Sequence, residues 1–179
     1  WDDNEKGREG VRAAGIEPVN LYQYDWATID TLILSPGIAL NYPQPHPIAR
    51  LAGSAGVDIF GDIELLSLSG ISARTIGITG TNGKSTTTAL IGHLLSHGNK
   101  KVEVGGNLGV PVLDLESQDD DGSYVLEMSS YQLELTHSLI FDVALLLNIS
   151  PDHLDRHGGM AGYIAAKKRI FAGQSHSQV

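Results

Sequence analysis

Ten residues decide the fold of this chain: Gly77–Thr86, which read GITGTNGKST. They overlap the end of a short apolar run, Thr75–Thr79, and lead into Ser85–His97, which we predict to be a helix. A glycine-rich turn between a strand and a helix N-terminus directs backbone N–H groups at one point, where the helix dipole also favours an anion. The stretch therefore predicts a phosphate-binding loop, in which Lys84 reaches the outer phosphates of a nucleotide and the Ser85 hydroxyl holds Mg²⁺.

The loop departs from the general P-loop spacing at one position. Five residues before Gly83 the chain has Ile78, where the general pattern has glycine. The alternative interpretation is an ordinary glycine-rich turn that carries an exposed lysine. The order strand, loop, helix favours the phosphate loop, because phosphate binding requires that context.

The residues after the loop predict a doubly wound α/β domain. The apolar runs are short enough for buried parallel strands, and they alternate with helical segments. The predicted strands are 102–104, 124–126 and 143–147, with a glycine loop at 105–107 and a final helix at 160–171. On the helix after the phosphate loop, Leu90, Ile91, Leu94 and Leu95 mark the expected buried stripe.

The residues before the loop predict a smaller α/β unit with a parallel sheet. Helices are expected at 6–14 and 48–55, and strands at 31–34 and 57–60. The stretch 65–74, with Gly70 and three serines, is the candidate boundary. We therefore divide the chain into residues 1–72, the latter part of a Rossmann-like N-terminal domain, and 73–179, the first part of a P-loop ATPase-type central domain.

Composition excludes several classes of function. Lys and Arg number 12 and Asp and Glu 21, so the formal net charge is −9. This acidity, with 6% aromatic residues, argues against nucleic acid or an anionic membrane as partner. The chain has no cysteine, which excludes disulfides, thiolate zinc sites and cysteine nucleophiles. No apolar run approaches the roughly 20 residues of a membrane span.

Two further segments carry candidate metal ligands. Glu127 ends the run 124–126, and ligands of open α/β sheets gather at the carboxyl ends of strands, so this carboxylate predicts a Mg²⁺ ligand. The segment 148–157 follows another predicted strand and is dense in ionisable side chains, which is typical of the rim of a site. The alternatives are an ordinary surface acid and a solvated polar loop. His153 and His157 have zinc-ligand spacing, but Pro151 and the glycines after His157 disfavour the helix that this spacing needs.

Lys167 lies at the centre of the apolar stripe of the last predicted helix. Met160, Tyr163, Ile164, Ile170 and Phe171 form that stripe, whereas Lys168 lies roughly 95° away from its centre. One interpretation is a lysine whose stem covers apolar surface while its ammonium reaches water. The other is an inward lysine whose pKa is lowered, giving a neutral amine that reacts with CO₂ to form a carbamate, a carboxylate-like metal ligand.

These motifs together resemble one family. The loop 80–86 (GTNGKST), the loop 105–109 (GGNLG), the run 126–134 (LEMSSYQLE), the segment 148–156 and Ser35-Pro36-Gly37-Ile38 occur in the order found in the Mur ligases of peptidoglycan synthesis. Ser85-Thr86 after the lysine, and the Ser-Ser-Tyr-Gln-Leu run, are most similar to the D-glutamate-adding members. Folylpolyglutamate synthetases share the glycine loop but typically have glycine after the lysine.

The resemblance implies a role for each matching residue. It implies ATP-phosphate binding by Gly80, Thr81, Asn82, Gly83, Lys84, Ser85 and Thr86. It implies one Mg²⁺ on Ser85 and Glu127, and a second on His153 and carbamylated Lys167. It implies that the path of the UDP-linked substrate is lined by Ser35, Pro36, Gly37, Asn107, Ser129 and His153. Lys84, Glu127, His153 and Lys167 would form the catalytic set.

The resemblance also implies the reaction and its setting. It implies ATP-dependent joining of D-glutamate to UDP-N-acetylmuramoyl-L-alanine through an acyl phosphate, by a monomer in the bacterial cytoplasm. Family members have three domains, so we expect this chain to be a piece without the amino-acid-binding domain and to show no ligase turnover alone. The roles of Asp2, Asp3 and Asn4, at the family's uracil-contacting edge, stay open. Two alternatives also stay open: a ligase of the superfamily with another acceptor, and a non-catalytic module that senses ATP.

Overall fold

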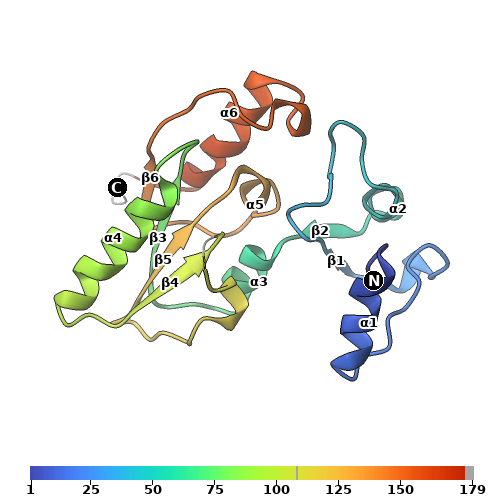
Figure 1. The fold of residues 1–179 in the computed structure, drawn as a ribbon, viewed down its shortest axis with the longest axis horizontal. Helices are drawn as coiled ribbons and strands as arrows, with labels where there is room; N and C mark the ends of the chain where they lie inside the picture. Colours follow the sequence, from blue (N-terminus) through green and yellow to red (C-terminus); the bar gives the residue numbers. More distant parts are fainter. Residues whose placement is uncertain (108, 176–179) are drawn as a thin grey trace.

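The computed structural model describes residues 1–107 and 109–175 and contains two parallel sheets (Figure 1). The larger sheet has the strand order β4-β5-β3-β6. Its members are β3 (Arg74–Thr79), β4 (Val102–Gly106), β5 (Ser123–Glu127) and β6 (Val143–Leu146). The smaller sheet pairs β1 (Thr31–Ile33) with β2 (Asp58–Phe60). All pairings are parallel, as predicted.

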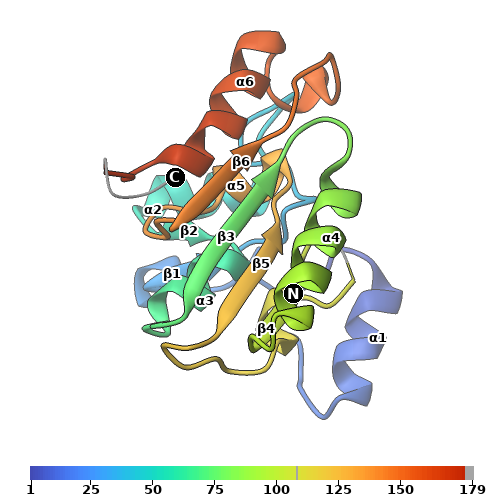
Figure 2. The ribbon, with the colours of Figure 1, turned by 90° about the vertical axis from the view of Figure 1, so that its left-hand side faces the viewer.

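Helices cover both faces of the larger sheet, so this part is a doubly wound α/β fold (Figure 2). One face carries α4 (Lys84–His97). The core of the other face takes side chains from α3 (Asp62–Leu68), from α5 (Ser130–Glu134) and from the short 3-10 turn Arg169–Phe171 that follows α6 (Met160–Lys168). The smaller sheet is accompanied by α1 (Glu5–Ala13) and α2 (Pro47–Ala55). Among the described residues, three other 3-10 turns lie at Trp26–Thr28, Val112–Asp114 and Leu154–Arg156.

Most of the predicted helices and strands are confirmed to within one or two residues, and three details are corrected. Gly105 and Gly106 belong to β4 and not to a loop. The helices α3 and α5 were not predicted. The expected stripe on α4 is half wrong, because Leu90 and Leu94 are 53% and 60% exposed, whereas Ile91 and Leu95 are half-buried. The helix instead buries Thr88 and Gly92, and a Cβ on Gly92 would lie 2.4 Å from Val104 Cγ2, so the glycine sets the close approach.

The segment before β3 joins the two parts of the molecule. Ile63 and Leu66 of α3 lie in the core of the larger sheet. Between them, the buried Glu64 carboxylate accepts hydrogen bonds from the backbone N–H groups of His137 (2.6 Å) and Ser138 (3.0 Å). Residues 62–68 thus pack with the larger sheet, while the division at residue 72 stays a prediction.

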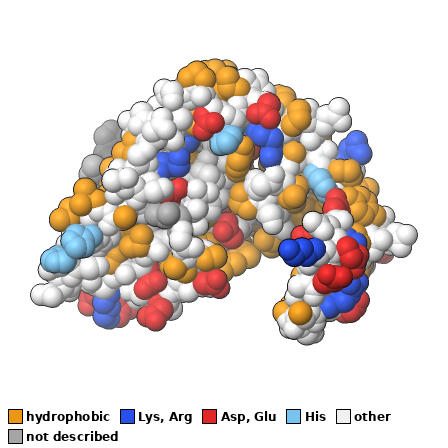
Figure 3. All heavy atoms as spheres, viewed as in Figure 1, with side chains coloured by type: hydrophobic (Ala, Val, Ile, Leu, Met, Phe, Trp, Pro, Cys, Tyr) orange, Lys and Arg blue, Asp and Glu red, His pale blue; other side chains and the backbone are white. Residues whose placement is uncertain are grey.

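The surface carries charged side chains of both signs, in agreement with the composition. Figure 3 shows cationic and anionic side chains mixed over α1, and the surface hollowed between the two parts of the molecule. Within residues 1–107 and 109–175, no helix has both the length and the apolar character needed to cross a membrane.

Candidate functional site

The predicted phosphate loop lies between β3 and α4. Gly83 caps α4 with φ +83°, a left-handed conformation that favours glycine, and Lys84 is the first residue of the helix. The first N–H groups of a helix have no acceptor within it, and here they carry no side-chain cap. The N-terminus of α4 therefore offers donors and a favourable dipole to an anion.

Asn148, two residues after the end of β6, fixes the tip of this loop. Its backbone oxygen accepts from Thr81 N (3.0 Å), its side-chain oxygen accepts from Asn82 N (2.9 Å), and its Nδ2 donates to Asn82 O (3.0 Å). The Thr81 hydroxyl lies within hydrogen-bond distance of Tyr163 OH (3.0 Å) and Ser150 O (3.1 Å). The N–H groups of Thr81 and Asn82 are thus already bound, which leaves those from Gly83 onward for a phosphate. The sequence placed Asn148 only within the predicted rim 148–157 and gave Tyr163 no polar role; the usable signal for Asn148 is its position just past the predicted strand 143–147.

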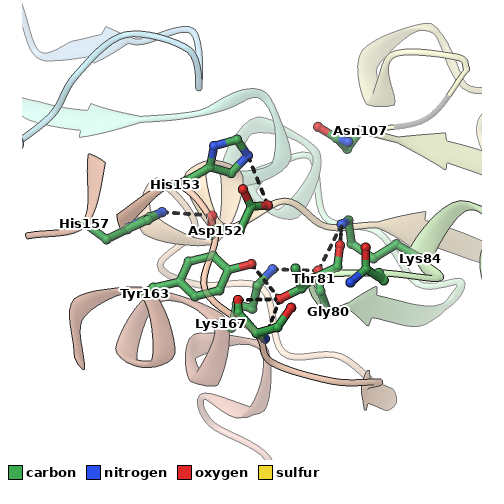
Figure 4. Close-up of polar contacts among 12 residues, drawn as sticks. Gly80, Thr81, Lys84, Asn107, Asp152, His153, His157, Tyr163 and Lys167 are labelled. Carbon is green, nitrogen blue, oxygen red and sulfur yellow. Dashed lines mark hydrogen bonds and ion pairs between the residues drawn. The ribbon is translucent and has the colours of Figure 1, made fainter. Parts of the chain in front are cut away.

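Lys84 turns back over the loop. Its Nζ donates to Gly80 O (2.9 Å) and Thr81 O (3.0 Å), as Figure 4 shows. Both acceptors are uncharged carbonyls. The ammonium charge therefore stays available for a phosphate that approaches the helix N-terminus.

Glu127 has one oxygen held and one oxygen free. It ends β5, is 2% exposed, and its Oε1 accepts from Asn107 Nδ2 (2.8 Å), while Oε2 is buried and has no partner among the described residues. Gly106 allows the backbone of β4 to lie close to the backbone at Glu127: its φ is +98°, and a Cβ there would lie 2.5 Å from Glu127 O. A buried carboxylate oxygen without a donor fits a hard cation such as Mg²⁺.

The described residues offer few protein ligands for such an ion. Among them, no group of three His, Asp or Glu side chains could hold a metal together. Mg²⁺ commonly takes one or two protein oxygens and completes its shell with phosphate and water, so Glu127 and the exposed Ser85 at the start of α4 fit that pattern.

Lys167 points inward, which agrees with the second of the two interpretations, the inward lysine. It is 2% exposed, and its Nζ donates to Gly80 O (2.8 Å) and Thr79 Oγ1 (3.4 Å) and lies 4.8 Å from the Tyr163 ring centroid. Burial and the nearby Lys84 charge lower the pKa of Lys167 to about 8, against the opposing effect of Asp152 and Glu127. The expected stripe is partly wrong, because Phe171 is 40% exposed and Ala166 takes its place in the buried face.

Five predicted site residues line one cavity of about 130 Å³: Lys84, Asn107, Ser129, His153 and Lys167. Ser130, Tyr131, Asp152 and Tyr163 complete its wall. The Ser129 side chain caps α5, accepting from Gln132 N (3.2 Å) and donating to Gln132 Oε1 (3.0 Å). His153 begins the turn after β6 with its side chain 52% exposed and Nε2 3.5 Å from Asp152 Oδ2.

The turn Ser35–Gly37, after β1, lies outside this cavity. Ser35 lines a second cavity, of about 280 Å³, together with Asp2, Asp3 and His46. Arg156 joins the turn to the site: it donates to Gly37 O (2.9 Å) and lies over the Tyr131 ring.

The three N-terminal polar residues left open by the sequence have local contacts. Asn4 caps α1, accepting from Lys6 N (3.0 Å). The Asp3 carboxylate lies within hydrogen-bond distance of Trp1, Tyr22 and His46.

Comparison with known proteins decides the family. The model of the Mur ligase middle domain matches residues 78–179, which include the phosphate loop, Glu127, His153 and Lys167. The chain belongs to the Mur ligase family. This Mur ligase chain is 52% identical over 180 residues to the UDP-N-acetylmuramoylalanine–D-glutamate ligase of Caulobacter vibrioides (strain NA1000 / CB15N). It is 54% identical over 174 residues to the enzyme of the same name from Paramagnetospirillum magneticum (strain ATCC 700264 / AMB-1).

These relatives are much longer than the chain. The matches cover 97% and 96% of this Mur ligase chain, but only 38% and 37% of the two relatives. Among solved structures, UDP-N-acetylmuramate:L-alanyl-γ-D-glutamyl-meso-diaminopimelate ligase from Neisseria meningitides matches 98% of the chain and 63% of its own length, with a TM-score of 0.55 and 16% identity. UDP-N-acetylmuramate–alanine ligase from Thermotoga maritima matches 94% of the chain and 39% of its own length, with a TM-score of 0.53 and 23% identity. At these identities the two structures support the fold alone.

Proposed function

We propose that this chain carries the phosphate- and metal-binding core of an ATP-dependent ligase that joins D-glutamate to UDP-N-acetylmuramoyl-L-alanine. The observation that carries the proposal is the single cavity shared by Lys84, Asn107 and Lys167, with the free Glu127 oxygen behind Asn107. The substrates come from the enzyme name that the relatives from Caulobacter and Paramagnetospirillum share.

In this proposal the residues divide between ATP and two Mg²⁺ ions. The loop 80–86 surrounds the ATP phosphates, with the N–H groups of Gly83–Thr86 as donors. Ser85 and Glu127 would hold the first Mg²⁺, and His153 with carbamylated Lys167 would hold the second. Bound Mg²⁺ would neutralise charge on the phosphates and the substrate carboxylate, which repel each other as they approach.

The chemistry has two steps. A carboxylate oxygen of the UDP-linked substrate attacks the γ-phosphorus, the bond to the β-phosphate oxygen breaks, and ADP leaves. The D-glutamate amine then attacks the carbonyl carbon of the acyl phosphate, phosphate leaves, and the nitrogen loses a proton. Lys84 stabilises the charge on the transferred phosphoryl group, as a fixed cation beside the helix N-terminus.

The substrate path runs along Asn107, Ser129 and His153 and reaches the turn Ser35–Gly37. Arg156 supports this route, because it bridges the turn and the cavity wall. We further propose that residues 1–72 and 73–179 belong to separate domains, and that the enzyme works as a cytoplasmic monomer in cell-wall synthesis, with no nucleic-acid or membrane partner.

The test is ADP formation by the complete protein that the gene encodes. We expect ADP formation over many turnovers only when UDP-N-acetylmuramoyl-L-alanine, D-glutamate and Mg²⁺ are all present, because without D-glutamate the acyl phosphate is not consumed. ADP formed with a folate and L-glutamate instead would establish the folylpolyglutamate-type alternative. A non-catalytic module would form no ADP, and Glu127→Ala would then preserve its biological role while Lys84→Ala abolished it.

A further inference from the structure

A string of three hydrogen-bonded polar side chains, with two of them buried, lies beside the cavity. His157 is 3% exposed. Its Nδ1 lies 2.9 Å from Glu134 Oε1, and its Nε2 lies 2.9 Å from Ser130 Oγ. A carboxylate only accepts, so Nδ1 donates to Glu134, and in the neutral ring Nε2 accepts from the Ser130 hydroxyl. Both ring nitrogens are therefore committed to α5.

His157 ends the turn that His153 begins. Arg156 N donates to His153 O (3.0 Å), and His157 N donates to Leu154 O (3.3 Å), so the turn 154–156 is closed between the two histidines. His153 has φ +49° and ψ 31°, a left-handed conformation that costs a non-glycine residue roughly 1–2 kcal/mol. Such a conformation persists only where surrounding contacts over-determine it.

The His153 side chain has little to hold it by itself. It is half exposed, and its Nε2 lies 3.5 Å from Oδ2 of the neighbouring Asp152. Its ring lies 5.2 Å from the Tyr131 ring, which stacks at 5.4 Å and 16° on the His157 ring. Because Tyr131 also belongs to α5, the buried His157 ties the turn to the same short helix against which His153 rests. His153 lines the cavity and His157 does not, and Figure 4 shows the His153 side chain beside that of Asp152.

We infer that His157 is a positioning residue: through Glu134 and Ser130 it anchors the turn 154–156 to α5 and so holds His153 at the cavity. The consequence for the second Mg²⁺ rests on the proposed function, but the placement of the His153 ring does not. The two can therefore be tested apart.

The first measurement is the aromatic ¹H–¹³C spectrum of the chain, with the His153 signal assigned through His153→Asn. In the wild type we expect this signal displaced by the ring current of Tyr131. In His157→Leu it moves to the position of unfolded histidine, while the signals of the larger sheet stay in place. The matched control is His93→Asn, an exposed histidine on α4, which leaves the His153 signal unchanged.

An unmoved His153 signal in folded His157→Leu would overturn the inference. If that variant fails to fold, Glu134→Gln and Ser130→Ala each weaken or remove one hydrogen bond of the string, and both are expected to move the same signal part of the way. An unmoved signal in both variants would overturn the inference equally.

The second measurement counts bound Mn²⁺ by electron paramagnetic resonance in the presence of a non-hydrolysable ATP analogue. We expect two ions in the wild type and one in His157→Leu. Two ions in both proteins would overturn the link between His157 and the metal. A wild type that binds no ion contradicts the proposed function, and leaves the result of the spectrum to decide the positioning role.

Discussion

Burial of Lys167 makes the stability of this chain depend on pH in a specific direction. The pKa of Lys167 is lowered from 10.5 to about 8, first by burial and then by the Lys84 charge. Between these values the unfolded chain binds a proton that the folded chain has released, so the free energy of unfolding rises with pH across that interval. At about 1.36 kcal/mol per pKa unit, the full rise from below pH 8 to above pH 10.5 is roughly 3 kcal/mol.

The perturbation is Lys167→Met, which keeps a long flexible chain and removes the charge. Gly80 O loses the Lys167 donor but keeps the Lys84 donor at 2.9 Å, so the substitution leaves no buried carbonyl unpaired. We therefore expect the variant to gain stability relative to the wild type at pH 7, and to lose that advantage as the pH approaches 10.5.

The assay is urea unfolding of both proteins at several pH values from 7 to 10.5, because other titrating groups cancel in the difference. Lys168→Met, on the exposed side of the same helix, is the control and should show no such pH dependence. A difference between Lys167→Met and wild type that stays constant over this range would refute the reasoning. The same pKa makes roughly a quarter of Lys167 neutral at pH 7.5, which is the form that carbamylation needs.

Three other predictions follow from single contacts. Asn107→Leu removes the donor to Glu127 Oε1, so nucleotide binding in the presence of Mg²⁺ should weaken about 10-fold, as measured by calorimetry. An equal loss of affinity without Mg²⁺ would contradict the role of Asn107 in orienting a metal ligand. Burial raises the pKa of Glu64, but its hydrogen bonds from His137 and Ser138 lower the pKa by more, so the net shift is downward. The stabilisation by this carboxylate is therefore present above pH 4.5 and is lost as the pH falls. Glu64→Ala should cost about 2–3 kcal/mol in urea unfolding at pH 7, and a cost unchanged at acid pH would count against this reasoning. Arg156→Gln breaks the hydrogen bond to Gly37 O. Amide hydrogen exchange in the turn 35–38 should then become about 10-fold faster, while exchange in β3 stays unchanged. Equal exchange rates in the wild type and the variant would show that this hydrogen bond does not stabilise the turn.

The sequence predicted the strand–loop–helix core because its signals are local. Glycine spacing, an apolar run and a helix stop each act within a few residues, so the bounds of β3 and α4 were close. The inward direction of Lys167 followed from helical periodicity in the same way.

The errors come from contacts between distant residues. Leu90 and Leu94 form an apolar stripe, yet α4 turns its Gly92 face to the sheet because only a residue without a side chain allows the approach to Val104. The sequence did not reveal how Asn148 and His157 hold distant segments, for a related reason. Each acts on a segment at least 20 residues away, through hydrogen bonds that no local pattern encodes.

The central claim is that this chain binds nucleotide phosphates through Lys84 with a metal held by Glu127. Isothermal titration of the chain with a non-hydrolysable ATP analogue, with and without Mg²⁺ and beside Lys84→Ala, tests it most directly. The account predicts binding that strengthens with Mg²⁺ and is lost in Lys84→Ala. Absence of binding to the folded chain, or binding that Lys84→Ala retains, would contradict the account.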